Sequence, residues 1–137
     1  AFHGSADPIV PYQGGPSDRF DQPFPAIPEW VEVLARHNGC LGEALALPAN
    51  GDVSGVQYTD CAGDVIFYTI AGGGHGWPGG EPIPEWIVGY TTMDIDATQV
   101  IWEFFTQHPL EEEQPPGQSA ITLSQADDSI NFTPVNR

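Results

Sequence analysis

The fold is decided by the stretch Val65-Ile66-Phe67-Tyr68-Thr69-Ile70-Ala71-Gly72-Gly73-Gly74-His75-Gly76-Trp77-Pro78-Gly79-Gly80. Its first six residues are β-branched or aromatic, which predicts a short buried strand. Glycines then end the strand and allow the backbone to turn sharply, so that His75 follows the strand's C-terminal end. Because ligands and reacting groups gather at such strand ends in α/β sheets, we place the candidate functional site around His75.

The length and composition indicate one folded domain. The chain has 137 residues, and 40% of them are hydrophobic, which is enough for a core. Its 16 glycines and 14 prolines predict many loops. We found no internal repeats and no apolar run long enough to span a membrane.

The charge balance excludes several partners. There are 19 acidic residues against three basic ones, all arginine, and the formal net charge is −16. Nucleic acids and anionic membranes need cationic groups on their protein partners, so neither is expected to bind. The charge favours solubility and an extracellular or salty setting.

The expected elements follow from periodicity and from turn residues. We predict a strand tail at 1–2, an exposed loop at 13–24, a helix at 27–38, an irregular segment at 41–54 with a turn at Asn50-Gly51, a hairpin of 56–60 with 65–70, an ordered surface loop at 81–90 and a helix at 94–107. Segment 111–137 differs in kind, because its acidic, proline-rich start is typical of a linker or docking tail. The expected organisation is therefore a domain at 1–110 and a tail at 111–137.

The two predicted helices have apolar stripes that should face the core. In the first, the stripe is Trp30, Val33 and Leu34. In the second, apolar residues around Trp102 and Phe105 cover most of the surface, which predicts deep packing. Thr92 or Asp94 is expected to cap this second helix.

Two loops that follow predicted strands offer complementary chemistry. Asp7 comes soon after the strand that ends at Phe2, and His75 follows the strand that ends near Ile70. A buried aspartate can hold an imidazole in one tautomer, and the imidazole can then take a proton from a hydroxyl nucleophile. The alternative is that Asp7 only forms a turn before a proline. His3, for its part, could hold the Asp7 loop by a local hydrogen bond.

The motifs resemble one family, the secreted polyhydroxybutyrate depolymerase and feruloyl esterase family of α/β-hydrolases. The similar segments, in chain order, are His3-Gly4-Ser5-Ala6-Asp7-Pro8-Ile9-Val10-Pro11-Tyr12, Asn38-Gly39-Cys40, Cys61, Tyr68-Thr69-Ile70-Ala71-Gly72-Gly73-Gly74-His75-Gly76-Trp77-Pro78-Gly79 and Asp96-Ala97-Thr98 to Trp102-Glu103-Phe104-Phe105. In α/β-hydrolases the triad follows the order serine, aspartate, histidine. The resemblance implies Asp7 as the triad acid, His75 as the triad base, and a fold that is the C-terminal part of an α/β-hydrolase: its last core strands and flanking helices.

The nucleophile that the resemblance implies is missing from this sequence. The family uses a serine within Gly-x-Ser-x-Gly, and none of the six serines here has glycines two positions away on both sides. We therefore expect this chain to be a processed or truncated C-terminal piece of a secreted carboxylic ester hydrolase, inactive alone. The expected partners are an ester substrate and either the missing N-terminal half of the hydrolase or identical subunits. The alternative is a non-catalytic structural or self-assembling extracellular protein derived from a hydrolase.

The two cysteines and two of the tryptophans have open roles. Cys40 and Cys61 allow one disulfide, which would indicate an oxidising compartment, or they are separate buried thiols; the resemblance implies the disulfide. Trp77 and Trp86 either line a substrate cleft or anchor the core. No cofactor is implied, and the four scattered histidines lack metal-ligand spacing, so no metal is expected.

Overall fold

The computed structural model describes residues 1–81 and 83–109. Along the chain its elements are β1 (Phe2–Gly4), β2 (Gly15–Ser17), β3 (Phe20–Phe24), α1 (Ile27–His37), β4 (Leu45–Asn50), β5 (Val53–Tyr58), β6 (Val65–Ile70), α2 (Glu85–Val88) and α3 (Ala97–Gln107). The predicted tail at 111–137 lies outside the described residues.

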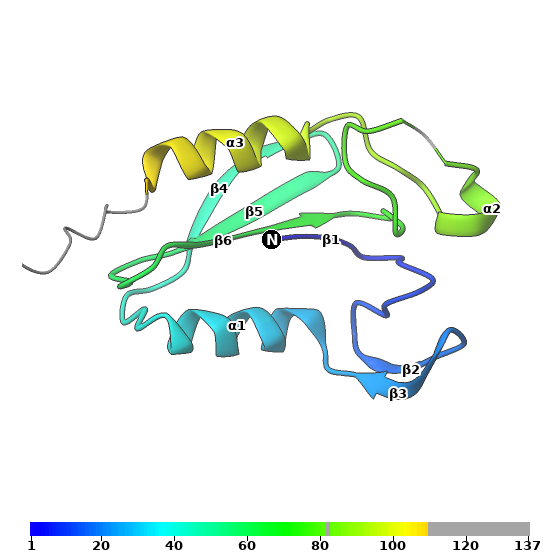
Figure 1. Ribbon diagram of the computed structural model, residues 1–137, viewed down its shortest axis with the longest axis horizontal. Helices are drawn as coiled ribbons and strands as arrows, with labels where there is room; N and C mark the ends of the chain where they lie inside the picture. The colour runs from blue at the N-terminus through cyan, green and yellow to red at the C-terminus, as the bar shows by residue number, and fades with distance from the viewer. Residues whose placement is uncertain (82, 110–137) are drawn as a thin grey trace, which may run out of the picture.

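The main sheet is mixed and has the order β1-β6-β5-β4. β1 runs parallel to β6, whereas β5 is antiparallel to both β6 and β4. Figure 1 shows α1 and α3 on opposite faces of this sheet, with β1 along one edge. The predicted hairpin of 56–60 with 65–70 is confirmed, because β5 pairs with β6 from Val53 opposite Ile70 to Tyr58 opposite Val65.

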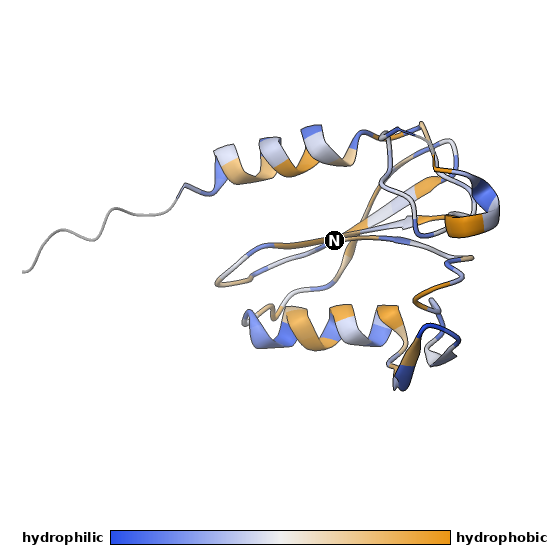
Figure 2. Ribbon diagram, turned by 45° about the vertical axis from the view of Figure 1, so that its right-hand side comes forward, coloured by the Kyte–Doolittle hydropathy of each residue, from blue (hydrophilic) through white to orange (hydrophobic). Residues whose placement is uncertain are grey.

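Strand β6 carries the core because its alternate residues face α1. Val65 and Phe67 are buried together with Val31 and Ala35 of α1. The helix itself begins as expected, with a proline in its first turn. Hydrophobic and hydrophilic residues are interleaved along α1 (Figure 2), so only part of its surface can face this core.

The predicted inner stripe of this helix is wrong. Val31 and Ala35, four residues apart, face the sheet, whereas Trp30 and Val33 are exposed. Leu34 is half-buried at the margin. Hydrophobicity alone favoured Trp30, but the sheet fixes the buried face and selects the smaller side chains that fit closely against β6.

Three expected loops contain regular structure. Segment 41–54, predicted as irregular, holds β4, which the confirmed Asn50-Gly51 turn folds back onto β5. Segment 13–24, predicted as an exposed loop, holds the β2–β3 hairpin, and segment 81–90 holds the one-turn helix α2. β2, β3 and β4 are short and mostly exposed, so only strand pairing defines them, whereas α2 is a single helical turn.

The sequence predicted deep packing for helix α3, and this prediction is wrong for the described residues. Trp102 is 69% exposed and Phe105 is also exposed. A cavity of about 400 Å³ lies beside the helix, lined by residues of α3 and of the sheet that include Tyr68 and Phe104. The helix is capped by Asp96, whose Oδ1 accepts from the Gln99 N–H at 3.0 Å, and not by Thr92 or Asp94.

Cys40 and Cys61 form a disulfide, as predicted. The bond joins the end of α1 to the connection between β5 and β6. Across residues 1–81 and 83–109, no helix is both long and apolar enough to cross a membrane.

Candidate active site

The candidate site lies where two neighbouring parallel strands end. In the register of β1 and β6, Gly4 stands opposite Ile70. Asp7 follows β1 by three residues, and His75 follows β6 by five. Parallel pairing therefore brings the two predicted site residues to the same edge of the sheet from positions 68 residues apart.

The Asp7 carboxylate is held by the backbone of its own loop. Its Oδ1 accepts hydrogen bonds from the N–H groups of Ile9 and Val10, each at 2.8 Å. This arrangement is an aspartate turn, so the turn-forming role expected for Asp7 and its role towards His75 coexist. The side chain is only 3% exposed, and these donors stabilise the negative charge that burial disfavours.

The second carboxylate oxygen is directed at the histidine. Asp7 Oδ2 lies 2.8 Å from His75 Nδ1. An ionised carboxylate only accepts, so this bond requires the hydrogen on Nδ1 and leaves Nε2 with a free lone pair when the ring is neutral. The His75 side chain is 44% exposed and lines a cavity. The pair thus presents an oriented, accessible base.

Close backbone packing around the loop explains its glycines. A Cβ on Gly4 would collide with the Gly73 carbonyl, and one on Gly74 would collide with the Val88 carbonyl. Gly74 N–H also donates to the Tyr90 carbonyl at 2.7 Å. The glycine run therefore lets the histidine loop pass tightly between β1 and the segment after α2.

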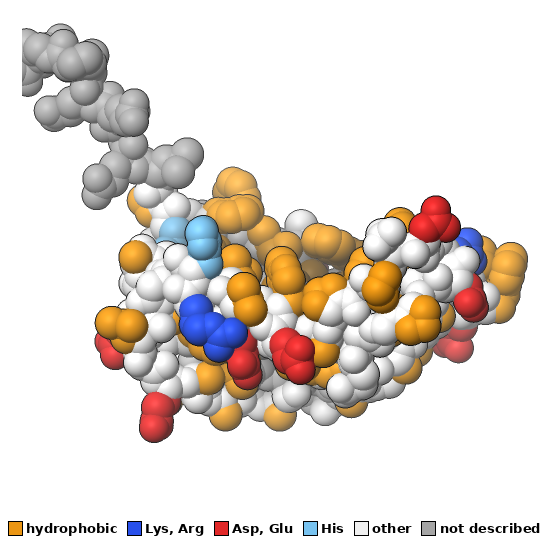
Figure 3. Space-filling view, turned by 90° about the horizontal axis from the view of Figure 1, so that it is seen from below, with side chains coloured by type: hydrophobic (Ala, Val, Ile, Leu, Met, Phe, Trp, Pro, Cys, Tyr) orange, Lys and Arg blue, Asp and Glu red, His pale blue; other side chains and the backbone are white. Residues whose placement is uncertain are grey.

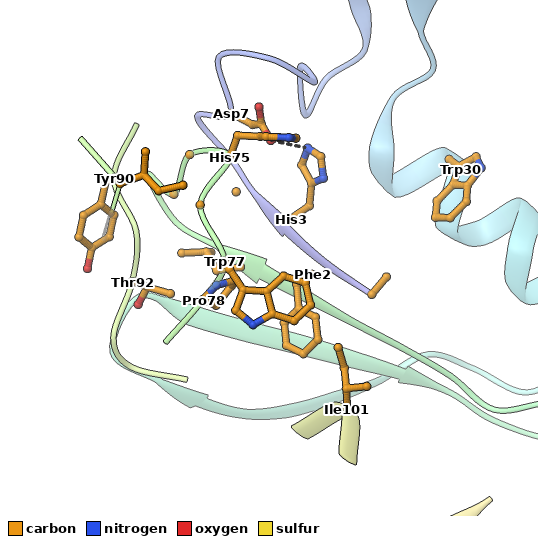
Figure 4. A pocket seen from close by; sticks show the side chains of 17 residues that line it. Phe2, His3, Asp7, Trp30, His75, Trp77, Pro78, Tyr90, Thr92 and Ile101 are labelled. Carbon is orange, nitrogen blue, oxygen red and sulfur yellow. Dashed lines mark hydrogen bonds and ion pairs between the residues drawn. The ribbon is translucent and has the colours of Figure 1, made fainter. Parts of the chain in front are cut away.

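His3 also lies beside the Asp7 carboxylate. Its Nε2 is 2.9 Å from the Val10 carbonyl oxygen and 3.6 Å from Asp7 Oδ2. The structure thus confirms the expected local hydrogen bond that holds the Asp7 loop. Figure 4 shows Asp7, His75 and His3 gathered at one end of the cavity.

The cavity beside His75 has a volume of about 710 Å³ and a largely aromatic and aliphatic lining. Trp77 lines it, and its Nε1–H donates to Thr98 Oγ1 of α3 at 3.0 Å. Trp30 of α1 and Phe2 of β1 contribute further aromatic surface (Figure 4). Sequence reasoning missed Trp30 as a lining residue because it assigned that side chain to the core.

Trp86 does not share this position. It lies on α2, is 86% exposed, and is absent from the cavity lining among the described residues. The exposure contradicts the core role, and a cleft role for Trp86 stays a prediction. The four-residue helix α2 has one buried side chain, Val88, and the indole of Trp86 is exposed to solvent.

The described residues place no nucleophile beside His75. Ser5 Oγ accepts from the Gly72 N–H at 2.8 Å, and Ser17 Oγ donates to the Ile9 carbonyl. Both cysteines are in the disulfide. Within this part of the chain, His75 has no hydroxyl hydrogen-bonded to its ring, and no cluster of three or more potential metal ligands occurs.

Comparison with known proteins gives an esterase-like relationship. No protein-family model and no solved structure matches the chain. A curated protein from Nocardia uniformis subsp. tsuyamanensis, named "Putative esterase NocK", is 31% identical over 122 residues. The match covers 76% of this chain but 36% of the Nocardia protein, so the chain spans about a third of the length of the relative it matches.

Proposed function

We propose that this chain supplies the acid and the base of a serine esterase whose nucleophile lies in another segment or chain. The observation that carries the proposal is the hydrogen bond of 2.8 Å between buried Asp7 and accessible His75 at the ends of adjacent parallel strands. The similarity to an esterase-like protein supports the same reaction class. The corresponding fold is the C-terminal part of an α/β-hydrolase, and the finer family is the polyhydroxybutyrate depolymerase and feruloyl esterase family.

The proposed reaction proceeds by acyl transfer. A serine hydroxyl loses its proton to His75 Nε2 while its oxygen attacks the ester carbonyl. The imidazolium, stabilised by Asp7, then returns the proton to the departing alkoxide, and an alcohol leaves. Water attacks the acyl-serine with the same proton transfers and releases the acid. Bound esters would lie in the cavity against Trp77.

An open side of the molecule supports the need for a partner. β1 ends the sheet and has β6 on one side only, so the outer edge of β1 can receive another strand. Hydrophobic side chains gather around a hollow in the view of Figure 3. The large exposed apolar residues include Trp30 and Val33 of α1 and Trp102 and Phe105 of α3. Exposed apolar area of this kind marks interaction surfaces.

We infer that the remainder of the hydrolase covers this side. A second copy of the same chain is less favourable, because each copy carries a net charge of −16 and the two would repel. The relative that the chain matches has about two thirds of its length outside the match, which is room for a serine-bearing segment. The disulfide is consistent with assembly in an oxidising compartment, and we propose secretion.

The test uses native material captured with an antibody raised against the 137-residue chain. We expect a fluorophosphonate probe to label a serine outside these 137 residues, on the same or a co-purifying polypeptide, together with ester turnover. A pure 14.8 kDa species without label or turnover would contradict the proposal. That result would instead favour a non-catalytic assembly protein, for which the exposed apolar helix faces are the supporting observation.

A further inference from the structure

His3 occupies a mostly enclosed place beside the proposed acid. It lies on β1, directly opposite Thr69 in the register with β6, and its side chain is 15% exposed. Its ring is tilted against that of Tyr12, with centroids 6.0 Å apart. The Tyr12 hydroxyl is in turn hydrogen-bonded to Thr69 Oγ1 at 2.9 Å. Its neighbours therefore restrict the orientation of the imidazole.

The hydrogen bond from His3 acts on the residue that holds the carboxylate. Val10 donates its N–H to Asp7 Oδ1 at 2.8 Å, and its carbonyl lies 2.9 Å from His3 Nε2. His3, Val10 and Asp7 thus form a connected chain of contacts. Val10 therefore links His3 to Oδ1, an oxygen that the Ile9 N–H also holds.

The chemistry of the acceptor fixes the tautomer of His3. A carbonyl oxygen only accepts, so Nε2 must carry the hydrogen. The same N–H lies 3.6 Å from Asp7 Oδ2, which is too long for a second hydrogen bond, so that oxygen stays available to His75. Neutral His3 is sufficient for this arrangement.

We propose that His3 is a positioning residue: through the Val10 carbonyl it fixes the Asp7 carboxylate in the orientation that holds the Nδ1–H of His75. The inference deepens the proposed esterase function and rests on it for its catalytic consequence. The effect of His3 on the contact between Asp7 and His75 involves only residues of this chain. The net contribution of one hydrogen bond changes an equilibrium constant about tenfold. We therefore expect loss of the His3 bond to have an effect of that size.

The test compares two variants of the full 137-residue chain by proton–nitrogen NMR of the His75 ring. His3→Phe keeps an aromatic ring beside Tyr12 but removes the donor, whereas His3→Gln can place an amide N–H near the position of Nε2. We expect solvent exchange of the His75 Nδ1 proton to accelerate about tenfold in His3→Phe and to stay within about twofold in His3→Gln. His3→Met, also without a donor, replaces His3→Phe if that variant does not fold.

A control separates positioning from general packing. Tyr12→Phe removes the hydroxyl bond to Thr69 but leaves the contact between His3 and Val10 in place. It should leave the exchange of the His75 proton unchanged. Unaltered exchange in the donor-free variants, or equal acceleration in Tyr12→Phe, overturns the inference. In the complete hydrolase we expect kcat to fall about tenfold in His3→Phe at constant KM. If no esterase activity is found at all, the proposed function is refuted, but the NMR result still tests the positioning role of His3.

Discussion

Asp7 Oδ2 lies 2.8 Å from His75 Nδ1, although 68 residues separate the two side chains in the sequence. The parallel pairing of β1 with β6 produces this proximity, because both strands end at the same edge of the sheet. The acid is almost fully enclosed and has two further donors, whereas the base is accessible. An accessible imidazole held by an enclosed carboxylate is the arrangement that general-base chemistry uses.

Under the proposed esterase function, Asp7→Asn should lower turnover of the complete enzyme strongly with little loss of stability. The amide oxygen can still accept from the backbone of Ile9 and Val10, but the amide nitrogen cannot accept from His75 Nδ1. The opposite imidazole tautomer is then favoured, and we expect kcat to fall about 10⁴-fold. Ester kinetics and the NMR tautomer of His75 check this. Asp7→Ala is the control, because it also removes the loop bonds and should lower stability; normal turnover in Asp7→Asn would exclude the triad role.

Thr98→Val should loosen the Trp77 wall of the cavity. The substitution keeps the shape of the side chain and removes the acceptor for the indole N–H. Because the bond is exposed, we expect a stability loss of at most about 1 kcal/mol. Fluorine NMR of chain labelled with 5-fluorotryptophan should show a shifted, broadened Trp77 signal. Thr98→Ser retains a hydroxyl and should preserve the signal; an identical spectrum in Thr98→Val would argue against the bond.

Two glycine substitutions should separate steric from conformational strain. Gly4→Ala places a methyl group against the Gly73 carbonyl, whereas Gly72 has open space around it but a φ of 70°. Gly72→Ala should cost about 1–2 kcal/mol from the backbone conformation alone. Gly4→Ala must separate β1 from the histidine loop, so we expect a larger loss, about 3 kcal/mol. Urea unfolding measures both; a smaller loss in Gly4→Ala would contradict the tight packing.

Reduction of the disulfide should destabilise the domain by about 3 kcal/mol in the chain-entropy model. The bond spans 21 residues and joins the end of α1 to the turn before β6. The double variant Cys40→Ala and Cys61→Ala should lose as much stability as the reduced protein and be insensitive to reductant. Urea unfolding with and without a thiol checks this. Equal midpoints for oxidised and reduced protein would refute it.

The sequence predicted the centre of the fold better than its margins. β6 and the glycine loop carry strong local signals, which placed His75 at a strand end. Its partnership with Asp7 was implied by the family resemblance, because the pairing of β1 with β6 has no local signal. β4 and the β2–β3 hairpin have no such signals, because their residues are mostly exposed and only pairing defines them.

Burial of the helices was the harder problem for sequence reasoning. A helical stripe shows which apolar residues share a face, but it does not show whether another element packs against that face. Trp30 and Trp102 therefore looked like core residues, and both are exposed in this chain. The contacts of Trp77 with Thr98 and of His3 with Val10 depend on tertiary placement and have no sequence period.

The end of α3 should detach as pH rises. His108 lies at the helix C-terminus, with Nδ1 2.7 Å from the Phe104 carbonyl and Nε2 2.8 Å from Asp64 Oδ2. The Phe104 carbonyl, and after it the Asp64 carboxylate, raise the pKa of His108 above its usual 6.5, because only the imidazolium donates from both nitrogens.

The stability of the helix end should therefore fall, not rise, with increasing pH. A raised folded-state pKa gives stabilisation that is complete below the unfolded pKa and is lost as pH rises through the folded pKa. NMR titration of the His108 ring, with hydrogen exchange of α3 amides, should show exchange increasing across that range. Asp64→Asn should lower the pKa of His108 and shift the loss to lower pH. An unchanged titration in Asp64→Asn would mean that the ion pair does not hold the helix end in solution.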